Sequence, residues 1–598
     1  MKPILMTVDL TAGAAWTTPL DELFDTYLGG TGAATKLLMD EIAQNKDPLA
    51  ESSSVFFAIG PFNGVYPLCT KTVALFISPL TGNLGESHAG GNLAMALFQA
   101  GIHILKITGR SAYPCYIRIV NHEVSFHRAY SLKGMSALAS ERVLKERIGT
   151  AWKSSIISVG PAGERESPIA CVTVDTSRHF GRLGLGAVFG HKNLKAVIVS
   201  GSGGMEIGKH KGPYLKFYKK LYDQFVHSPA LNKYHDLGTS MNVLPLSRIN
   251  GLPTRNFSQG FFEGAESISG ESFADRLLIQ KIACAHCPVG CIHLAILREA
   301  FDEKNHQFKS NKIAYDFELI YAVGSNLSLN QPEDVLRLLL IIEKQGWDAI
   351  SMGVTLAWAT EAFMKGVISA RETGGLIFKF GDVDTYEAIL NRVIGEGRGG
   401  NAGRGGNAGS EFYRDLEKGT AFLSEKYGGE SFAITFGRNE APGYITGLHG
   451  FLGFSTGIRH SHLDSAGYSL DQKKHGFEKP AEAWTEDLFR EGRWRTLLNS
   501  LVICLFARNV FTMPTILEGL AALGMTQWDE GKLQELAKKI HVMKYQLKKD
   551  LGFSFERERL PKKLASVYTA TGIIDESEYL RQMRVFEDLL AKDAASLT

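Results

Sequence analysis

The feature that most constrains this chain is the segment CAHCPVGC, which places three cysteines within eight residues, at Cys284, Cys287 and Cys291. Thiol exchange needs only two sulfurs, so three at this spacing form a compact three-point chelate rather than a redox dithiol alone. Pro288 and Gly290 favour a turn that points successive sulfurs inward. A cubane 4Fe-4S cluster also needs a fourth thiolate. Cys504 is the only cysteine after 291, and we expect it to be that ligand.

Two other interpretations of this segment stay open. One is zinc bound by four cysteines, although structural zinc motifs usually pair two C-x2-C knuckles, and this chain has no second knuckle. The other is a segment that binds no metal. His286 and His293 lie close by, and either can support the ligands without coordinating. Cys69, Cys115 and Cys171 are scattered, and we expect them to be ordinary buried residues.

Composition places the chain among globular proteins. Its 598 residues are 44% apolar and 21% charged, which is enough apolar material for large cores and too little charge for disorder. The net charge of +2 gives no general attraction to nucleic acid or to an anionic membrane. No apolar run reaches the roughly 20 residues that span a bilayer, and the N-terminus lacks the pattern of a secretory signal. We therefore expect a cytoplasmic protein with neither nucleic acid nor membrane as a partner.

The pattern of apolar residues changes near residue 210. Before it, short apolar segments broken by glycines predict mostly strands; after it, apolar residues spaced three and four apart predict helices. This indicates an α+β protein with a sheet-rich N-terminal cofactor-binding domain at 1–205 and two mainly α-helical domains at 206–415 and 416–598. The repeat GRGGNAGRGGNAGS at 397–410 has no apolar residue larger than alanine, so we expect a surface loop there.

Five features taken together resemble the aldehyde:ferredoxin oxidoreductase family, whose tungsten or molybdenum enzymes carry two pyranopterins and one 4Fe-4S cluster. They are LGGTGAATKLLMDE (28–41), SPLTGNLGESHAGG (78–91), GRLGLGAVFGHKNLKAVIVSG (181–201), CAHCPVGC and the distant Cys504. One glycine-rich piece alone is a weak signal, but the ordered set with four cysteines in register is specific. The resemblance runs from Val8 to about Ala507. It implies a first domain that forms the base of the cofactor site, with two helical domains closing over it.

An iron-sulfur cluster moves single electrons and usually serves a second centre in the same protein. The resemblance implies that this centre is a tungsten (or molybdenum) bis-pyranopterin, with a magnesium ion bridging the pterin phosphates. Two dithiolenes would give the metal four sulfur ligands, so the protein would donate few or none. Lys71 stands where the family commonly has an arginine between cluster and pterin. By the same resemblance, two glycine-rich loops contact the pterins, through His88, Ala89 and Gly90 and through Arg178, His179, Phe180 and Gly181.

Two further loops look like the family's pterin-binding D-x-x-G-L-[DC] pair. The first is EKQGWD, with glutamate in place of the leading aspartate, and it supplies Glu343, Gly346, Trp347 and Asp348. The second is NSLVIC, which supplies Asn499 and Ile503. An asparagine amide both donates and accepts, so it can still bond a pterin edge. Because Cys504 ends the second loop, cluster and pterin should lie next to one another.

The family handles protons with a glutamate and a histidine near the metal. AYDFELIYAVGSN looks like the glutamate segment, where Glu318 is our first choice and Asp316 the alternative. GIRHSHLDSAG resembles the histidine segment, where His462 aligns best and His460 is the alternative. Converting an aldehyde to an acid adds a water-derived oxygen and releases electrons and protons, so an acid/base group is needed.

The resemblance implies an oxidoreductase that converts small aldehydes to carboxylic acids, reversibly, and passes electrons to ferredoxin or a ferredoxin-like iron-sulfur subunit, in a homo- or hetero-oligomer or alone. No cysteine lies between 291 and 504, so a thiolate ligand of the kind expected in the related tungsten benzoyl-CoA reductase catalytic subunits is missing. That favours the aldehyde-oxidising branch.

Three alternatives remain. The first is a low-potential reductase acting on acids or acyl thioesters, and the second is a non-catalytic iron-sulfur scaffold. The third is a nicotinamide site at GLGAVFG (184–190), which fits a dinucleotide-binding pattern. This third alternative is weak, because such a fingerprint directly follows a strand and the preceding HFGR is not predicted to be one.

Overall fold

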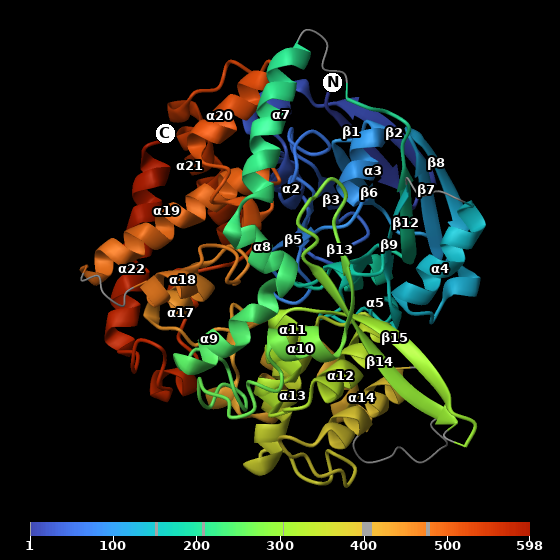
Figure 1. Ribbon diagram of the computed structural model, residues 1–598, viewed down its shortest axis with the longest axis vertical. Coiled ribbons are helices and arrows are strands. Elements are labelled where there is room, and N and C mark those ends of the chain that lie inside the picture. The colour runs from blue at the N-terminus through green and yellow to red at the C-terminus, as the bar shows by residue number, and fades with distance from the viewer. Residues whose placement is uncertain are drawn as a thin grey trace.

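The computed structural model describes residues 2–149, 154–205, 210–302, 304–397, 410–473 and 479–597. Two six-stranded sheets lie within residues 4–200, and helices dominate the rest. The predicted α+β class is therefore confirmed. Figure 1 shows the sheets in blue and cyan and the C-terminal helices beside them in orange and red; the green helix at 211–226 stands at the top, and the yellow-green helices at 317–397 lie below the sheets. The glycine-rich repeat predicted as a surface loop falls mostly at 398–409, outside the described residues.

The two large sheets share a plan. The first has the order β2-β1-β6-β3-β4-β5, with strands β1 (Ile4–Asp9), β2 (Ala14–Pro19), β3 (Val55–Ala58), β4 (Thr72–Ile77), β5 (Leu84–Ala89) and β6 (Ile104–Thr108). The second has the order β11-β10-β9-β12-β7-β8, with strands β7 (Cys115–Val120), β8 (Glu123–Arg128), β9 (Ser154–Val159), β10 (Val172–Val174), β11 (Arg178–Phe180) and β12 (Leu194–Ser200). Each sheet holds one parallel pair, β1 with β6 and β7 with β12, among antiparallel ones.

The edge strands β5 and β11 bring the two sheets together. They contact each other, and the aromatic rings of Phe57 and Phe180 pack 5.3 Å apart between the two sheets. The two glycine-rich loops predicted to bind pterin adjoin these edge strands. The sheets therefore meet at the place where the sequence predicts the floor of a cofactor site.

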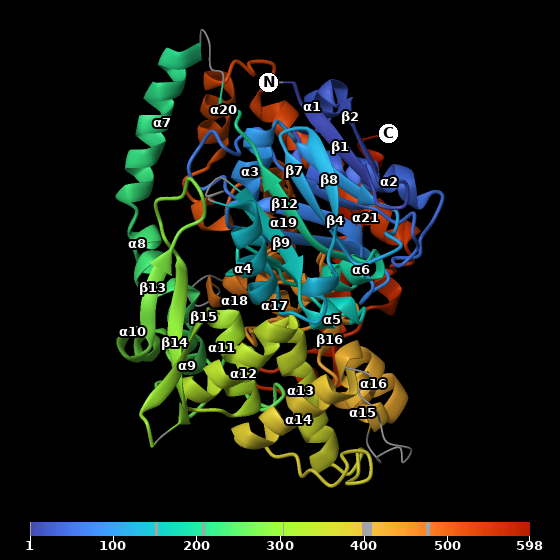
Figure 2. The same cartoon turned by 90° about the vertical axis from the view of Figure 1, so that its right-hand side faces the viewer.

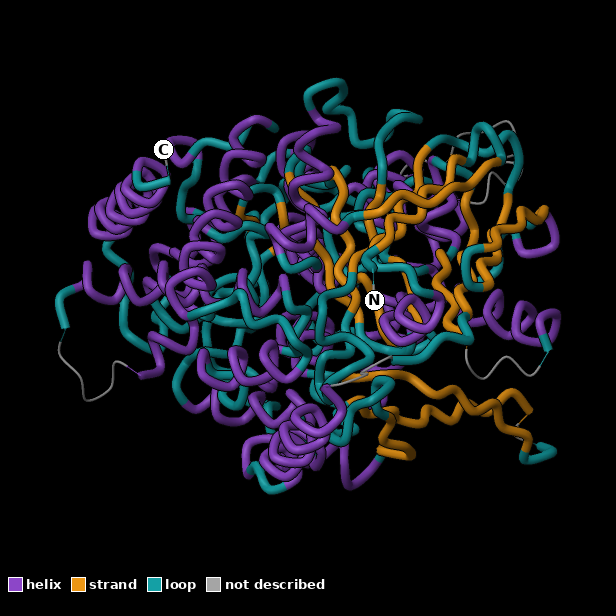
Figure 3. The backbone as a smooth tube through the Cα atoms, turned by 90° about the horizontal axis from the view of Figure 1, so that it is seen from above, coloured by secondary structure: helices purple, strands orange, loops and turns teal. Residues whose placement is uncertain are grey.

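Helices surround the sheets and cover the meeting edge. Those of the first region are α1 (Asp21–Tyr27), α2 (Gly30–Ile42), α3 (Leu93–Ala100), α4 (Ala137–Ile148), α5 (Pro161–Glu164) and α6 (Leu185–His191). The middle of the chain forms α7 (Lys211–Val226), α8 (Pro229–Asp236), α9 (Val243–Arg248), α10 (Gly270–Arg276), α11 (Phe317–Val323), α12 (Pro332–Gln345), α13 (Ala349–Met364) and α14 (Val383–Gly397). The last part forms α15 (Ser410–Asp415), α16 (Thr420–Tyr427), α17 (Leu448–Thr456), α18 (Gly467–Lys473), α19 (Ala481–Ser500), α20 (Met513–Ala522), α21 (Glu530–Asp550) and α22 (Glu576–Ala595). Figure 3 shows the strands gathered on one side of the molecule and most helices on the other.

Local sequence explains where the helices nearest the site begin and end. Asp316 caps α11, because its side chain accepts a hydrogen bond from the Leu319 amide at 3.2 Å. Pro332 opens α12, where its fixed φ suits the first turn. Gly346 ends α12 in the left-handed conformation with φ of 77°. The loop EKQGWD is thus the C-terminal end of α12, and Asp348 caps the following helix α13.

The cysteine segment lies in a sheet that the sequence patterns did not predict. Strands β13 (Leu278–Ile282), β14 (Ile292–Asp302) and β15 (Gln307–Tyr315) form a three-stranded antiparallel sheet within the region expected to be mainly helical. Figure 2 shows it as a long hairpin beside α8 and α11. The cysteines occupy the turn between β13 and β14, so the hairpin holds that turn against the rest of the protein.

The strand assignment before GLGAVFG was also incomplete. Residues 178–180 of that segment form β11, whereas we predicted no strand there. However, β11 is an antiparallel edge strand beside β10, while β12, which follows α6, lies between β9 and β7. A dinucleotide fold requires a parallel β-α-β unit at this point. The chain does not form one here.

No helix among the described residues combines the length and apolarity needed to cross a bilayer.

Candidate functional site

A central cavity opens where the two sheets meet the helices. It holds about 1900 Å³ of empty space, part of it continuous with solvent. Fourteen of the residues predicted from the sequence line it: Lys71, His88, Arg178, His179, Gly181, Asp316, Glu318, Glu343, Trp347, Asp348, His462, Asn499, Ile503 and Cys504. Segments more than 400 residues apart in the chain therefore converge on one space.

The four cysteines of the predicted cluster lie near one another, and Cys504 among them lines the cavity. Burial raises the pKa of Cys287 to about 12 and that of Cys291 to about 11, and the nearby thiols of Cys504 and Cys284 add to both rises. Such mutual effects require the four sulfurs to be near neighbours. Among the described residues, no three His, Cys, Asp or Glu side chains are close enough to hold a single metal ion.

Backbone contacts fix the cysteine turn against the first sheet. The Ala285 amide donates to the Gly91 carbonyl at 3.0 Å. A Cβ atom at Gly90 would lie 2.5 Å from the Cys284 Sγ, so only glycine leaves room for that sulfur. The fourth cysteine is held in the same way, since the Cys504 amide donates to the Leu68 carbonyl at 2.9 Å. The segments around residues 68 and 90 thus hold the cysteine turn and the Cys504 loop in place through backbone hydrogen bonds.

Lys71 lies between the thiols and the cavity. Its charge opposes the rise in the pKa of Cys291 and helps to lower the pKa of His88, so it is near both. No carboxylate in the described part of the chain forms an ion pair with it. The position between cluster and pterin that the resemblance implied for this residue stays a prediction.

Two cysteines expected to be ordinary buried residues lie at the site. Cys69 is 1% exposed, and burial together with Cys504 and Cys287 raises the pKa of its thiol well above the usual value. Cys171 lines the central cavity and its Sγ lies 3.9 Å from the Trp347 carbonyl. Their isolation in the sequence concealed this proximity, and only the position of Cys69 two residues before Lys71 hinted at it.

The loops predicted to bind pterin meet across the floor of the cavity. His179 on β11 lies 2.8 Å from a Glu343 oxygen at the end of α12, joining two predicted contacts directly. The loop EKQGWD is fastened to the second sheet's side, because the Cys171 amide donates to the Gly346 carbonyl at 2.9 Å. Ala89 and Phe180 are 2% and 0% exposed and do not line the cavity, so their side chains belong to the core.

Two arginines present unsatisfied donors in this region. The Arg182 Nε donates to Asp348 at 3.1 Å and its Nη2 to the Glu440 carbonyl at 2.7 Å, but its buried Nη1 has no partner. The buried Nε of Arg178 also has none. Both residues line the cavity. Unpaired buried donors on cations are costly unless an anionic ligand completes them.

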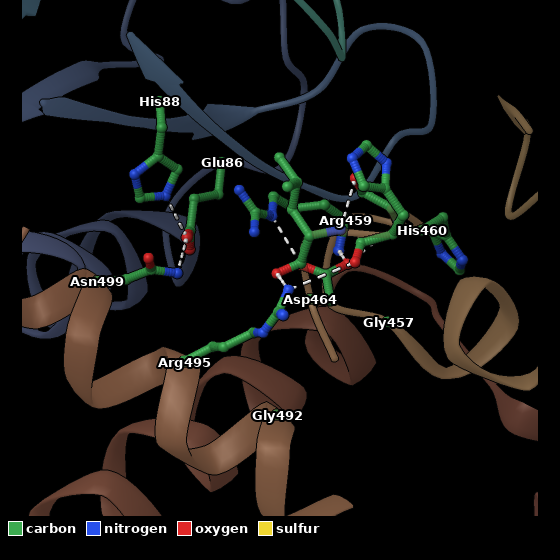
Figure 4. A network of polar contacts seen from close by, with 12 residues as sticks. Glu86, His88, Gly457, Arg459, His460, Asp464, Gly492, Arg495 and Asn499 are labelled. Carbon is green, nitrogen blue, oxygen red and sulfur yellow. Dashed lines mark hydrogen bonds and ion pairs between the residues drawn. The ribbon is translucent and has the colours of Figure 1, made fainter. Parts of the chain in front are cut away.

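Glu86 contacts both His88 and Asn499, two residues that the sequence predicts to bind the pterin. Its carboxylate lies 2.8 Å from the His88 ring and 3.5 Å from the Asn499 amide nitrogen, as Figure 4 shows. Burial alone would raise the pKa of Glu86, but Lys544 and His88 hold it well below its usual range. An ionised carboxylate thus orients two side chains that reach the cavity from opposite walls.

In the wall of the same cavity, Glu318 faces His462. The Glu318 Oε1 and the His462 Nδ1 are 3.4 Å apart, and neither buried atom has a hydrogen-bond partner. The second carboxyl oxygen of Glu318 accepts from the Gly443 amide at 3.1 Å. Burial raises the pKa of Glu318 to about 8. Burial, with the charge of Arg182, lowers the pKa of His462 well below its usual value.

The two alternatives have other tasks. Asp316 caps α11, although it also borders the cavity. His460 does not line the cavity: its Nδ1 lies 3.0 Å from the Phe454 carbonyl and its Nε2 3.2 Å from the Lys548 nitrogen. The geometry therefore favours Glu318 and His462 as the pair that reaches the open space.

Sequence reasoning missed a set of cationic and aromatic residues in the cavity wall. They are Arg182, Tyr234, Tyr444, Arg459, Tyr468, Arg495, Phe506 and Arg508. Tyr444 stacks on Tyr468 at 4.1 Å, and Tyr234 on Phe506 at 4.0 Å. Arg182 and Arg459 lie inside the segments 181–201 and 457–467 that the sequence analysis singled out, but the other six belong to no motif, and only their nearness to predicted positions could have pointed to them.

Comparison with known proteins identifies the family. The family model for the aldehyde ferredoxin oxidoreductase N-terminal domain matches residues 5–201, and that for domains 2 and 3 of the same family matches residues 216–591. A tungsten-containing aldehyde ferredoxin oxidoreductase of Pyrococcus abyssi is 30% identical over 466 residues, which are 76% of this chain and 72% of that protein. A protein of the same description from Thermococcus kodakarensis is 31% identical, over 73% of this chain and 69% of that protein.

Two further relatives extend the range. A WOR-like subunit of an aliphatic sulfonate oxidoreductase from Pyrococcus furiosus is 27% identical over 65% of this chain and 64% of that protein. A chain in the BamBC active-site complex of benzoyl coenzyme A reductase, solved with 1,5-dienoyl-CoA, has the same fold, with a TM-score of 0.77, 18% identity and 98% of each chain covered. The family models cover most of the sequence and agree with the resemblance in its motifs. The chain therefore belongs to the aldehyde ferredoxin oxidoreductase family of oxidoreductases.

Proposed function

We propose that the protein oxidises aldehydes to carboxylic acids at a bis-pterin tungsten or molybdenum centre and passes the electrons through a 4Fe-4S cluster to ferredoxin or a ferredoxin-like subunit. The observation that carries this proposal is the unpartnered Glu318–His462 pair in the wall of a cavity that Cys504 also lines. Proton transfer and electron transfer would thus both be served from one space.

The cysteine end fits a cluster. Cys284, Cys287, Cys291 and Cys504 would be its ligands. A cubane carries each thiolate on a different iron, so its ligands stand farther apart than those of one ion. That spacing agrees with the lack of a single-ion site among the described residues. The room left by Gly90 beside Cys284 also supports a bound group there, because a methyl side chain would displace the sulfur.

The cavity floor fits an anionic pterin cofactor. The unpaired donors of Arg178 and Arg182 suit phosphate oxygens, and Asp348, Glu343 and Asn499 can bond pterin edges. Backbone carbonyls of the glycine-rich loops would hold the magnesium ion. When bound, the metal would supply the two-electron oxidation and the site of oxygen addition.

Glu318 and His462 would manage the protons. The reaction adds water to the aldehyde and releases two electrons and two protons, so a base must act on the attacking water. Glu318, with a pKa of about 8, is poised for this role near neutral pH. His462 is neutral there, and its lowered pKa leaves the proton on Glu318, so its free Nδ1 would orient that carboxyl group by accepting a hydrogen bond from it across 3.4 Å. Glu318 would therefore take up the proton, and His462 would position it.

A reductase of acids or acyl thioesters is the second candidate, and its support is the fold shared with the benzoyl coenzyme A reductase complex and the WOR-like relative. Dye reduction by anaerobically purified, metal-loaded protein distinguishes the two. Simple aldehydes should reduce viologen dyes at rates that rise with pH through about 8. Acid or thioester reduction without any aldehyde oxidation would instead support the reductase. Protein that contains iron but neither tungsten nor molybdenum would support a scaffold.

A further inference from the structure

The wall of the central cavity is rich in positive charge. Six of its side chains are cationic and four are acidic among the described residues, and the cationic ones are Lys71, Arg178, Arg182, Arg459, Arg495 and Arg508. Three arginines are neutralised by a neighbouring carboxylate: Arg182 by Asp348, Arg459 by Asp464 and Arg495 by Glu491. Lys71 and Arg178 lie at the end where cluster and pterin are proposed. Neither an ion pair among the described residues nor the proposed cofactors account for the charge of Arg508.

Arg508 stands where the cavity meets the surface. It lines the central cavity and also an outer groove, which we define by Ser469, Gln472, Trp494, Arg495, Arg508 and Asn509. Only Arg495 and Arg508 border both spaces. Figure 4 shows Arg495 extending from α19 toward the 457–464 turn, where it donates to the Leu463 carbonyl at 2.9 Å. Arg495 thus already has hydrogen-bond partners in the protein, whereas the charge of Arg508, where the two spaces meet, has no carboxylate partner among the described residues.

The guanidinium of Arg508 keeps one edge available. Its Nη1 donates to the Leu505 carbonyl at 2.8 Å, which fixes the side chain at the end of the cysteine-bearing loop. No carboxylate in the described part of the chain comes within 4.0 Å of it. The Nε and Nη2 donors together match the two oxygens of a carboxylate. A half-buried arginine whose side chain is fixed in this way can form an ion pair with an anion that enters the cavity from solvent.

A path of aromatic rings leads from Arg508 to the proton-handling pair. Tyr468 is near both ends, since the charges of Arg495 and Arg508 oppose the rise in its pKa while Glu318 adds to that rise. The Tyr468 ring lies 5.9 Å from the His462 ring and stacks on Tyr444. Flat faces along this path suit a planar or extended substrate body.

We propose that the preferred substrate is an aldehyde that also carries a carboxylate, which pairs with Arg508 at the cavity mouth while the aldehyde group reaches Glu318 and His462. This inference rests on the proposed aldehyde oxidation and adds the substrate class. No atom beyond those of that oxidation is transferred. The carboxylate stays unchanged and serves only to orient the molecule.

A matched pair of substrates tests the proposal in the holoenzyme. 4-Formylbenzoate and its methyl ester differ in charge at one end and share the reacting group. We expect the unaltered enzyme to favour the carboxylate in kcat/KM by about ten- to hundredfold, the worth of a hydrogen bond to a charged group. Equal kcat/KM values for the two compounds would overturn the proposal without any variant.

Variants then locate the preference. Arg508→Gln should lower the ratio of the two kcat/KM values to near one, and Arg508→Lys should retain part of it, because a point charge remains without the planar fork. The control is Arg490→Gln, which removes an exposed cation of the outer groove that already pairs with Asp487. An equal loss in the control would mean that the general field, not Arg508, selects the anion.

Binding measured by calorimetry separates this inference from the proposed function. In Glu318→Gln protein, 4-formylbenzoate should bind about ten times more tightly than its ester, and adding Arg508→Gln should remove the difference. Iron content and the visible spectrum of each variant verify that the cluster beside Cys504 is intact. If no aldehyde is oxidised but the binding preference holds, the oxidation fails and the anion site stands. If aldehydes are oxidised with no preference for charge, only the anion site fails.

Discussion

The two ends of the central cavity are built in different ways. At the cysteine end, three of the four proposed ligands come from one turn of eight residues, and Gly90 leaves room for the Cys284 sulfur. At the Glu318–His462 end, the two side chains come from segments 144 residues apart and meet without a hydrogen bond. Apart from Cys504, the first end is specified locally, and the second is specified by the packing of α11 against the 457–467 turn. The cysteine end should therefore depend on single residues, and the proton end should respond gradually to pH.

The largest expected effect is at the cysteine end. Cys504→Ala removes the ligand that closes the cluster, so reduction of an external acceptor should fall by more than about a hundredfold, beyond what loss of a ligand's supporting partner costs. Iron and acid-labile sulfide per chain should fall with it. Cys115→Ala, at a buried cysteine of β7 remote from the site, is the control and should keep both. Normal rates in Cys504→Ala protein would show that the cluster does not use this residue.

The next effect is at the proton end. Glu318→Gln should lower kcat by about 10²- to 10⁴-fold, the usual contribution of a general base, while iron content stays unchanged. Asp316→Asn is the matched control, since Asp316 lies in the same turn, where it caps α11 and borders the cavity without contacting His462. Comparable losses in both variants would contradict the assignment of Glu318.

The pH profile sharpens the same contrast. Burial raises the pKa of Glu318 to about 8, so the fraction of Glu318 that is ionised increases as pH rises. Because the ionised form is the base, kcat/KM should increase to a plateau above pH 8. The pKa of His462 lies well below its usual value, so its titration adds no second rise or fall to the pH profile of kcat/KM near pH 7. The rising limb should be absent in Glu318→Gln. A limb that survives the substitution would belong to another group.

A smaller effect is expected at the glycine beside the thiols. Gly90→Ala places a methyl group 2.5 Å from the Cys284 Sγ, so the cluster should be incompletely incorporated and iron per chain should fall about twofold. Gly212→Ala, where an added Cβ meets nothing within 4 Å, is the control. Full iron content in Gly90→Ala protein would show that the turn can move, and would weaken the claim of local specification.

The smallest effect concerns Lys71. Removing its charge with Lys71→Gln makes the reduced, more negative cluster less favourable. We expect the midpoint potential to fall by about 40 mV, since that shift corresponds to about 1 kcal/mol of charge interaction in a one-electron couple. Lys71→Arg keeps the charge and should restore the potential. Redox titration followed by electron paramagnetic resonance measures both, and an unchanged potential in Lys71→Gln would place the lysine away from the cluster.

The same contrast explains what the sequence could predict. The α+β class and the three closely spaced cysteines follow from local patterns that need few long-range contacts, whereas Cys504 was assigned only as the one cysteine after 291 and through the family resemblance. The sheet β13–β15 was missed because strands β14 and β15 expose much of their length and lack clean alternation. Propensity alone cannot identify such strands.

The choice between neighbouring candidates also needed the structure. His460 has a positive φ of 54° and turns toward Lys548, whereas His462 faces Glu318. The sequence His-Ser-His at 460–462 does not indicate which of the two histidines reaches the cavity. Cys69 and Arg508 became visible only through the packing of distant segments around the cavity. Side-chain direction at such points depends on tertiary contacts rather than on spacing.

Elemental analysis of anaerobically purified protein, with its visible spectrum, tests the central claim most directly. A cluster and a heavy-metal cofactor served from one cavity predict about four iron atoms per chain, together with about one tungsten or molybdenum atom, and an absorbance that bleaches on reduction. Zinc in place of iron, or iron without either heavy metal, would contradict the claim.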